Sequence, residues 1–278
     1  MQSSLDSLLQ IISTLPLWQK AIYVGACLVF FMALENIATA QQFAASSHYS
    51  HAKHIAKNLL FLLFSLIINS LFAALFISAS QWSAATAVGL FSHINLSSGL
   101  QLLISLVVLD FVAQYLCHIV LHKTPWLWKL HTVHHNDFHV DLSTGSRHHP
   151  IDYCTRELAA LACVVLLAMP VSHYLLYKLV SVFFTYFTHA NFRLPRPLES
   201  ILNKVFVTPD MHKVHHHQFL PLTDSNYGNI LSIWDRLFGT LRYKDVADIE
   251  YGVDTDIKEK ELAIAFQLRR PFLAKQLR

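Results

Sequence analysis

Three long segments consist almost entirely of apolar residues, and they limit the possible folds more than any other feature of the sequence. They run from about residue 18 to 38, 58 to 78 and 100 to 121. A helix needs about 20 apolar residues to cross a bilayer, so each segment predicts a membrane-spanning helix. Only 14% of the 278 residues are charged, against roughly a quarter in a soluble domain. The sequence therefore predicts an all-α integral membrane protein.

Two shorter apolar stretches follow, at about residues 158–169 and 171–187, with Pro170 between them. A proline inside such a run breaks or kinks a helix, and the first stretch is too short to span a bilayer upright. We expect a helical hairpin that enters the membrane and returns. With the hairpin included, we predict about four transmembrane helices.

Loop charges predict the orientation. The loop between the first two segments holds Lys53 and Lys57, whereas residues 79–99 contain no lysine or arginine. Cytoplasmic loops carry the excess of positive charge. The first loop should therefore be cytoplasmic, and the histidine motifs described below should face the cytoplasm. A multi-pass protein of this kind would lie in a bacterial inner membrane or the endoplasmic reticulum.

The distribution of polarity divides the chain into three regions. Residues 1–99 should form N-terminal membrane helices, residues 100–245 a catalytic domain, and residues 246–278 a polar C-terminal tail. The net charge is only +3. Because no basic stripe interrupts the apolar segments, nucleic acid is excluded as a partner.

Histidine is strongly enriched, with 14 of the 18 histidines between residues 118 and 217. They form one pair at i,i+4 and two HxxHH motifs. Residues at i, i+3 and i+4 share a helix face about 5–6 Å apart, so each motif should aim two or three imidazoles at one point. These eight residues, with His149 and His189, exceed the ligand number of one metal and suggest two. The predicted ligands are His118, His122, His131, His134, His135, His149, His189, His212, His215 and His216.

The surrounding residues narrow the choice of metal. Imidazole suits zinc, copper, iron and nickel. No cysteine joins the motifs, HExxH is absent, and there is no Glu-x-x-His pair; these absences disfavour a zinc finger, a zincin protease and a carboxylate di-iron site. What remains is an all-histidine site beside lipid. Two irons there could activate dioxygen (O2) against an unactivated C–H bond, which zinc could not.

Metal-bound histidines usually donate their second N–H group to a carboxylate or a carbonyl. The candidates for this role are Asp110, Asp210, Asp224, Asn226 and Asp235. Asp110 lies eight residues before His118, two helical turns back on roughly the same face. An ion pair or a helix–helix hydrogen bond is the alternative for Asp110.

Several motifs in a fixed order resemble a known family. They lie at residues 110–122, 128–135, 144–150, 187–191, 209–216 and 224–240. Over about residues 100–275 the chain resembles the fatty acid hydroxylase/sterol desaturase superfamily of membrane histidine-box di-iron oxygenases. The resemblance implies a transmembrane stem under a cytoplasmic helical cap that holds a histidine-ligated dimetal site.

The resemblance also implies an activity. The enzyme would use two iron ions, dioxygen as co-substrate and two electrons to hydroxylate a fatty acyl or sterol-type lipid from the bilayer. Desaturation of such a lipid at the same site is the alternative. Because no cytochrome b5-like domain is fused to the chain, we expect a separate electron donor of the cytochrome b5, ferredoxin or reductase type.

Two functions of other classes compete with this prediction. A histidine-rich membrane zinc transporter would place its ligands on several transmembrane helices near the midplane, whereas these motifs cluster at one mouth of the stem. A scaffold without catalysis would have no need for two HxxHH motifs. Metal content and oxygen dependence distinguish the three functions.

Overall fold

The computed structural model describes residues 2–38, 50–254 and 263–273. These residues form helices and connecting segments without a β-strand, and only two isolated bridges occur, Phe206–Leu231 and His217–Tyr251. The prediction of an all-α fold is therefore confirmed. Three helical segments are long and apolar enough to cross a membrane: Leu17–Ile37, His51–Ser92 and Ser98–Lys123.

The first two long helices follow a short one. Helix α1 (Gln2–Thr14) ends before Pro16, and α2 (Leu17–Ile37) begins directly after it. Helix α3 (His51–Ala85) is longer than its apolar segment, because no glycine or proline interrupts residues 51–85. The sequence had placed Lys53 and Lys57 in a loop. They lie instead in the first turns of α3.

The third long segment is a composite helix. It consists of α4 (Ser98–Val108), a π-helical stretch η2 (Leu109–Leu116) and α5 (Cys117–Lys123). A π-helical insertion widens the turn and changes the direction of the side chains that follow, and it is common at functional sites. Here it directly precedes the first histidine pair.

The hairpin predicted from Pro170 is present as α7 (Pro150–Leu167) and α8 (Val171–His189). The turn places Ala168 in the left-handed conformation, with φ 52°. Helix α3 packs along α7, and α1 and α2 pack along α8. The stacked rings of Phe76 and Tyr174, 3.7 Å apart, join α3 to α8 in the main apolar core. Insertion of this hairpin as a fourth span stays a prediction.

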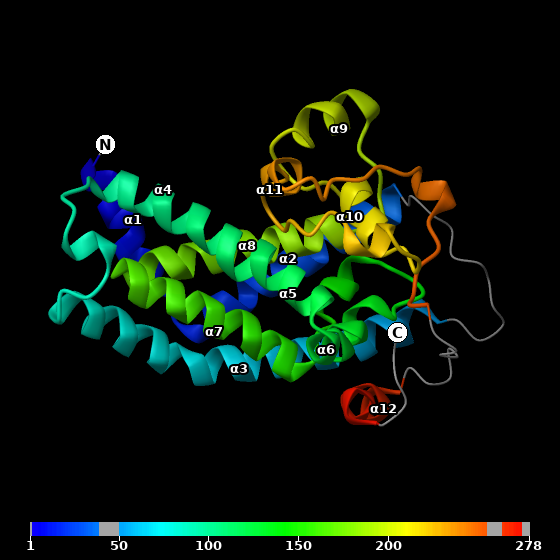
Figure 1. Ribbon diagram of the computed structural model, residues 1–278, viewed down its shortest axis with the longest axis horizontal. Coiled ribbons are helices and arrows are strands. Elements are labelled where there is room, and N and C mark those ends of the chain that lie inside the picture. The colour runs from blue at the N-terminus through cyan, green and yellow to red at the C-terminus, as the bar shows by residue number, and fades with distance from the viewer. Residues whose placement is uncertain (1, 39–49, 255–262, 274–278) are drawn as a thin grey trace.

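Short helices form a cap at one end of the long helices (Figure 1). They are α6 (Pro125–His135), α9 (Arg196–Leu202), α10 (Pro209–His215) and α11 (Ile233–Leu237), with 3-10 turns η3 (Leu142–Ser146), η4 (Leu222–Asp224) and η5 (Val246–Asp248). A further turn, η1 (Leu90–Ser92), precedes α4.

The C-terminal region contains α12 (Ile264–Arg269) and η7 (Arg270–Phe272), and η7 contacts both α12 and α6. Residues 255–262 and 274–278 of the predicted tail lie outside the described residues.

Candidate metal centre

Nine of the ten predicted ligands come together where the cap meets the long helices. Helix α5 carries the first pair, the last turn of α6 carries the first HxxHH motif, α8 ends at His189, and α10 carries the second HxxHH motif up to its C-cap. Each of the nine side chains is at most 5% exposed. Elements far apart in the sequence therefore deliver nine imidazoles to one buried volume.

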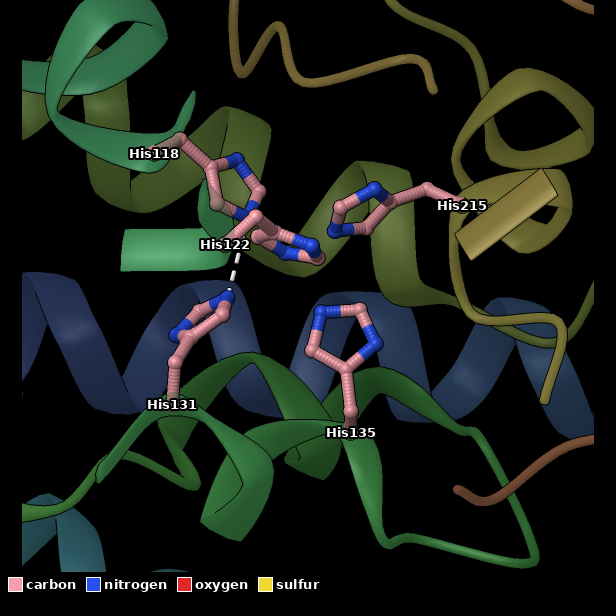
Figure 2. A group of neighbouring side chains, drawn as sticks. All are labelled: His118, His122, His131, His135 and His215. Atoms are coloured by element: carbon pink, nitrogen blue, oxygen red, sulfur yellow. Dashed lines mark hydrogen bonds between the residues drawn. The ribbon is translucent and has the colours of Figure 1, made fainter. Parts of the chain in front are cut away.

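The nine histidines form two clusters. Cluster one contains His118, His122, His131, His135 and His215; cluster two contains His134, His189, His212 and His216. Within each cluster, one ring nitrogen from every member lies within 4.8 Å of those of the others. Figure 2 shows cluster one, with the rings from α5, α6 and α10 pointing toward a common centre.

Both HxxHH motifs divide their histidines between the clusters. His131 and His135 belong to cluster one, whereas His134 between them belongs to cluster two. In the second motif the i,i+4 pair, His212 and His216, belongs to cluster two and the i+3 residue to cluster one. Residues at i and i+4 differ by about 40° around a helix and neighbours by about 100°. Each HxxHH motif therefore aims two imidazoles at one point, as expected, and directs its third imidazole to the other cluster.

Hydrogen bonds fix the proton position on five of the imidazoles. Their Nδ1 atoms face a carbonyl or carboxylate oxygen, which only accepts hydrogen bonds, so Nδ1 carries the proton and Nε2 has a free lone pair. The pairs are His118 with Tyr227 O (2.8 Å), His122 with Asp224 Oδ1 (3.1 Å), His131 with Asp152 Oδ2 (2.7 Å), His189 with Thr185 O (2.7 Å) and His215 with Ser225 O (2.7 Å).

The resulting nitrogen–nitrogen distances fit a bound metal. The Nε2 atoms of His118 and His131 are 3.0 Å apart, although neither carries a proton. His189 Nε2 likewise lies 3.0 Å from that of His212 and 3.2 Å from that of His134. The two lone pairs of His118 and His131 repel each other at this distance unless a cation lies between them. Nitrogens bound at right angles to one metal, at about 2.1 Å each, would be about 3.0 Å apart.

Other buried ring nitrogens fit the same interpretation. Among the described residues, both ring nitrogens of His135 and of His216 have no hydrogen-bond partner, nor has Nε2 of His215. A buried polar atom without a partner is costly. Coordination of metal ions would satisfy these atoms, so the residues present fit a metal centre.

Burial also keeps these imidazoles neutral. It lowers the pKa of His131 to about 4, even though the neighbouring Asp152 carboxylate opposes the shift. Burial, reinforced by neighbouring imidazoles, also lowers the pKa values of five further histidines well below the usual range. These are His134, His135, His212, His215 and His216. Metal ligation requires neutral imidazole, so the ligands are ready near neutral pH.

A family model provides independent support. The model of the fatty acid hydroxylase family matches residues 102–240, half of the chain, and this range contains all nine clustered histidines. The chain belongs to the fatty acid hydroxylase family. The superfamily resemblance seen in the sequence motifs is thereby confirmed.

Several curated relatives have names that describe the oxidation of a lipid. An ornithine lipid hydroxylase (OlsE) of Rhizobium tropici is 29% identical over 63% of this chain and 51% of its own length. Alkylglycerol monooxygenases of Caenorhabditis elegans and Homo sapiens are 32% and 29% identical, over 47% and 53% of this chain and 25% and 32% of theirs. The chain thus spans about half the length or less of these relatives. No solved structure matches the chain.

The acidic and amide groups predicted to orient the ligands have different positions. Asp224 does contact His122. Asp235 acts one step away: it accepts hydrogen bonds from the backbone of Tyr227 (2.8 Å) and Gly228 (2.9 Å), which fixes the carbonyl that faces His118. Asn226, at φ 50°, donates to Met211 O (2.8 Å) and holds the closing loop against α10.

Two predicted carboxylates hold other parts of the fold. Asp110 accepts hydrogen bonds from Trp234 Nε1 (2.8 Å) and from Leu231 N (3.2 Å). It therefore anchors the closing segment, and its bond to Trp234 on α11 is the helix–helix hydrogen bond given as the alternative for this residue. Asp210 pairs with Arg193 at 3.1 Å and lies 3.8 Å from Lys213 Nζ.

The residues around the RHHP motif, at 147–150, differ most from expectation. His149 lies outside both clusters: it caps α7 by accepting from Ile151 N at 3.1 Å, and its Nε2 lies 3.3 Å from Leu268 O. His148, which the sequence prediction leaves out, stacks on His134 with ring centroids 4.4 Å apart. Asp152 was also missed. The sequence did offer one signal for Asp152: it is an acidic residue in the first turn of the helix that follows this motif.

Proposed function

We propose that this protein is a membrane-bound lipid hydroxylase in which each histidine cluster holds one iron ion. The observation that carries the proposal is the convergence of imidazole Nε2 atoms, 3.0 Å apart, in two buried clusters at one end of an apolar helix bundle. Membership of the fatty acid hydroxylase family supports it. The names of the relatives favour hydroxylation over desaturation.

Iron would supply the oxidising chemistry: dioxygen, two electrons and two protons would convert a C–H group into an alcohol and water. The electrons would come from a separate donor of the cytochrome b5, ferredoxin or reductase type. The protein itself would position the ligands and the lipid and exclude bulk water. Asp152 and Asp224 would hold two imidazoles of cluster one in a fixed orientation.

A cavity of about 120 Å³ borders the histidines, with His118, His134, His189 and His212 in its wall. This is the space in which a C–H group could approach both clusters. Long apolar helices surround the cavity, so a lipid could reach it from the bilayer.

The proposal includes an orientation with the cap in the cytoplasm of a bacterial cell or facing the cytoplasm from the endoplasmic reticulum. In support, α3 begins beside the cap, where His51 Nε2 lies 3.1 Å from Asp141 Oδ2. Lys53 and Lys57 are therefore at the cap end of the stem. An excess of lysine on that side matches the usual charge bias of cytoplasmic ends.

The test is metal analysis with Mössbauer spectroscopy on protein purified from iron-57-fed cells, followed by lipid analysis under oxygen-18. We expect about two irons per chain, as the ligand number of two clusters requires, and one oxygen-18 atom in a lipid alcohol. His134→Ala should abolish turnover, whereas replacement of the exposed His93 should not. Zinc or no metal under iron-replete conditions, without oxygen uptake, would reject the proposal in favour of a transporter or a scaffold.

A further inference from the structure

Two cavities adjoin inside the helix bundle. The first is the 120 Å³ cavity beside the histidines, and the second, of about 200 Å³, lies farther from the cap between α1, α2, α3 and α8. They share part of their walls, namely Val24, Leu66, Asn69, Lys178 and Val182. The two cavities therefore adjoin and together extend from the apolar bundle to the histidines.

The cavity walls become more apolar away from the cap, and on α8 this change occurs around Lys178. Toward the cap, the same face of α8 presents Ser181 and Thr185 to the first cavity. Away from the cap it presents Leu175 and Val171 to the second. Residues three or four apart share a helix face, so this stripe lines both cavities without a break.

Helix α3 shows the same change at Asn69. Its cap-side positions Ser65 and Asn69 line the first cavity, and Ala73 and Phe76 line the second beyond it. The change on α3 is gradual, because Leu62 and Leu66 also line the first cavity and Ser70 also lines the second. Both helices nevertheless become more apolar in the same direction, so the boundary does not depend on a single side chain.

The boundary is built from charged and polar groups inside an apolar bundle. Lys178 Nζ donates to Tyr153 OH (3.0 Å) and Glu157 Oε1 (2.6 Å), which leaves a third proton for another acceptor. Asn69 Nδ2 donates to the same tyrosine oxygen at 2.9 Å. Polar groups at membrane depth are costly and tend to serve a function.

The charges of the polar cavity cancel. Lys178 is paired with Glu157, and Arg156 Nε lies 3.3 Å from Asp152 Oδ1. The wall contains both cations but neither carboxylate. Because each cation is paired with a carboxylate, the wall offers hydrogen-bond donors with little net positive charge. Such a wall favours an uncharged group that bears oxygen atoms over an anion.

We propose that the polar cavity binds the uncharged, oxygen-bearing headgroup of a lipid and the apolar cavity binds its hydrocarbon chain. The lipid then lies head first against the histidine clusters. If the proposed hydroxylase function holds, on which this consequence rests, the carbon that is oxidised lies in or next to the headgroup and not at the far end of the chain. A chain that entered first would bury methylene groups against the free donors of Lys178 and Asn69, which is unfavourable.

The test uses two photoreactive analogues of 1-O-hexadecylglycerol on the full-length protein in lipid nanodiscs. One carries a diazirine at the last chain carbon, the other at a carbon next to the ether oxygen. Mass spectrometry of the crosslinked peptides should place the chain-end probe near Ala73 and Leu175 and the head-end probe near Ser181 and Thr185. The reverse assignment, or labelling of neither cavity, would overturn the proposal.

Variants sharpen the assignment. Lys178→Met should reduce head-end labelling about tenfold through loss of the free donor, and Asn69→Leu should act in the same direction. Ala73→Trp should block chain-end labelling because it fills the apolar cavity. Leu71→Trp is the matched control on the same helix, at a side chain that is 69% exposed, and it should change neither.

Competition tests the headgroup chemistry. Unlabelled hexadecylglycerol should displace both probes, whereas hexadecane should do so weakly. Stronger displacement by palmitate than by hexadecylglycerol would show that the wall selects an anion, contrary to the proposal.

The labelling is carried out without oxygen or reductant, so it does not depend on turnover. Chain-first labelling in a protein that contains iron and hydroxylates lipid would overturn the binding orientation alone. Head-first labelling in a protein that lacks iron and turnover would reject the hydroxylase function and leave the binding orientation standing.

Discussion

The two histidine clusters are built in different ways. In cluster one, four of the five imidazoles are held through Nδ1, two by the carboxylates of Asp152 and Asp224 and two by backbone carbonyls. In cluster two, His189 is held by a carbonyl. No described residue accepts a hydrogen bond from the Nδ1 atoms of the other three.

The clusters also face different surroundings. Three of the four histidines of cluster two line the polar cavity, but only His118 of cluster one does so. Hydrogen bonds from the fold thus orient most of cluster one, whereas the orientation of cluster two would depend more on a bound metal. In the proposed enzyme, the cluster beside the substrate would be the less preformed of the two.

The largest effect should follow from removal of a ligand in either cluster. His135→Ala removes a ring from cluster one, and His134→Ala removes the adjacent ring, which belongs to cluster two. Each should lower turnover by more than about 100-fold, because ligand loss exceeds the 10–100-fold effect of losing an orienting group. The readouts are lipid hydroxylation and iron content in membranes, with insertion checked by protease accessibility. Normal turnover in either variant would contradict the assignment of that cluster.

Loss of a carboxylate partner should have the next largest effect, and it should act on cluster one. Asp152→Asn replaces the carboxylate that orients His131 with a neutral amide, which is a weaker acceptor, and should reduce iron affinity about 10–100-fold. Asp224→Asn should have a smaller effect, because its hydrogen bond to His122 is longer, 3.1 Å against 2.7 Å for Asp152. Iron titration of the metal-free protein gives the affinities. Equal affinity in wild type and Asp152→Asn would show that the carboxylate does not orient the ligand.

The sequence predicted much of this site because its information is local. HxxHH motifs, the i,i+4 histidine pair and long apolar runs can be recognised from spacing alone, and eight of the nine clustered histidines were found in this way. His189 lies outside these motifs and was added separately. Helix periodicity separates the i+3 histidine of each HxxHH motif from the other two, but which cluster each histidine joins was not predictable, because it depends on how α6 faces α10. Asp110 illustrates the same limit: its distance from His118 along the helix was clear, but its partner, Trp234, lies more than 120 residues away.

Chelation should separate the two clusters in time. If cluster two depends on its metal for orientation, a chelator should remove that metal about tenfold faster, since orienting partners change affinity by about this factor. Mössbauer spectra recorded during the reaction would show one iron environment disappear before the other. Asp152→Asn should bring the two rates together. Loss of both irons in a single phase from the wild type would contradict the comparison.

Crowding of one imidazole should perturb cluster two by a smaller amount. A Cβ atom at Gly145 would lie 2.8 Å from Thr185 Cγ2 and 3.3 Å from His189 Nδ1. Gly145→Ala should therefore displace His189 and lower turnover about three- to tenfold, below the loss expected from removal of an orienting partner. Gly25→Ala is the matched control, because its Cβ would meet no atom within 4 Å. A Gly145→Ala enzyme with unchanged turnover and chelation rate would show that His189 tolerates displacement.

The smallest effects on turnover are expected from substitutions of His148 and His149, two adjacent histidines whose roles the sequence alone did not distinguish. His148 stacks on His134 at an interplanar angle of 14° and lines the polar cavity, so His148→Ala should lower turnover about two- to fivefold without loss of iron, less than loss of a direct orienting partner. His149→Ala removes a helix cap and should destabilise the fold by about 1 kcal/mol, with iron content and turnover unchanged. Iron analysis and thermal unfolding of both variants make the comparison. Loss of one iron in His149→Ala would restore this residue as a ligand and show that the tenth predicted histidine reaches the centre.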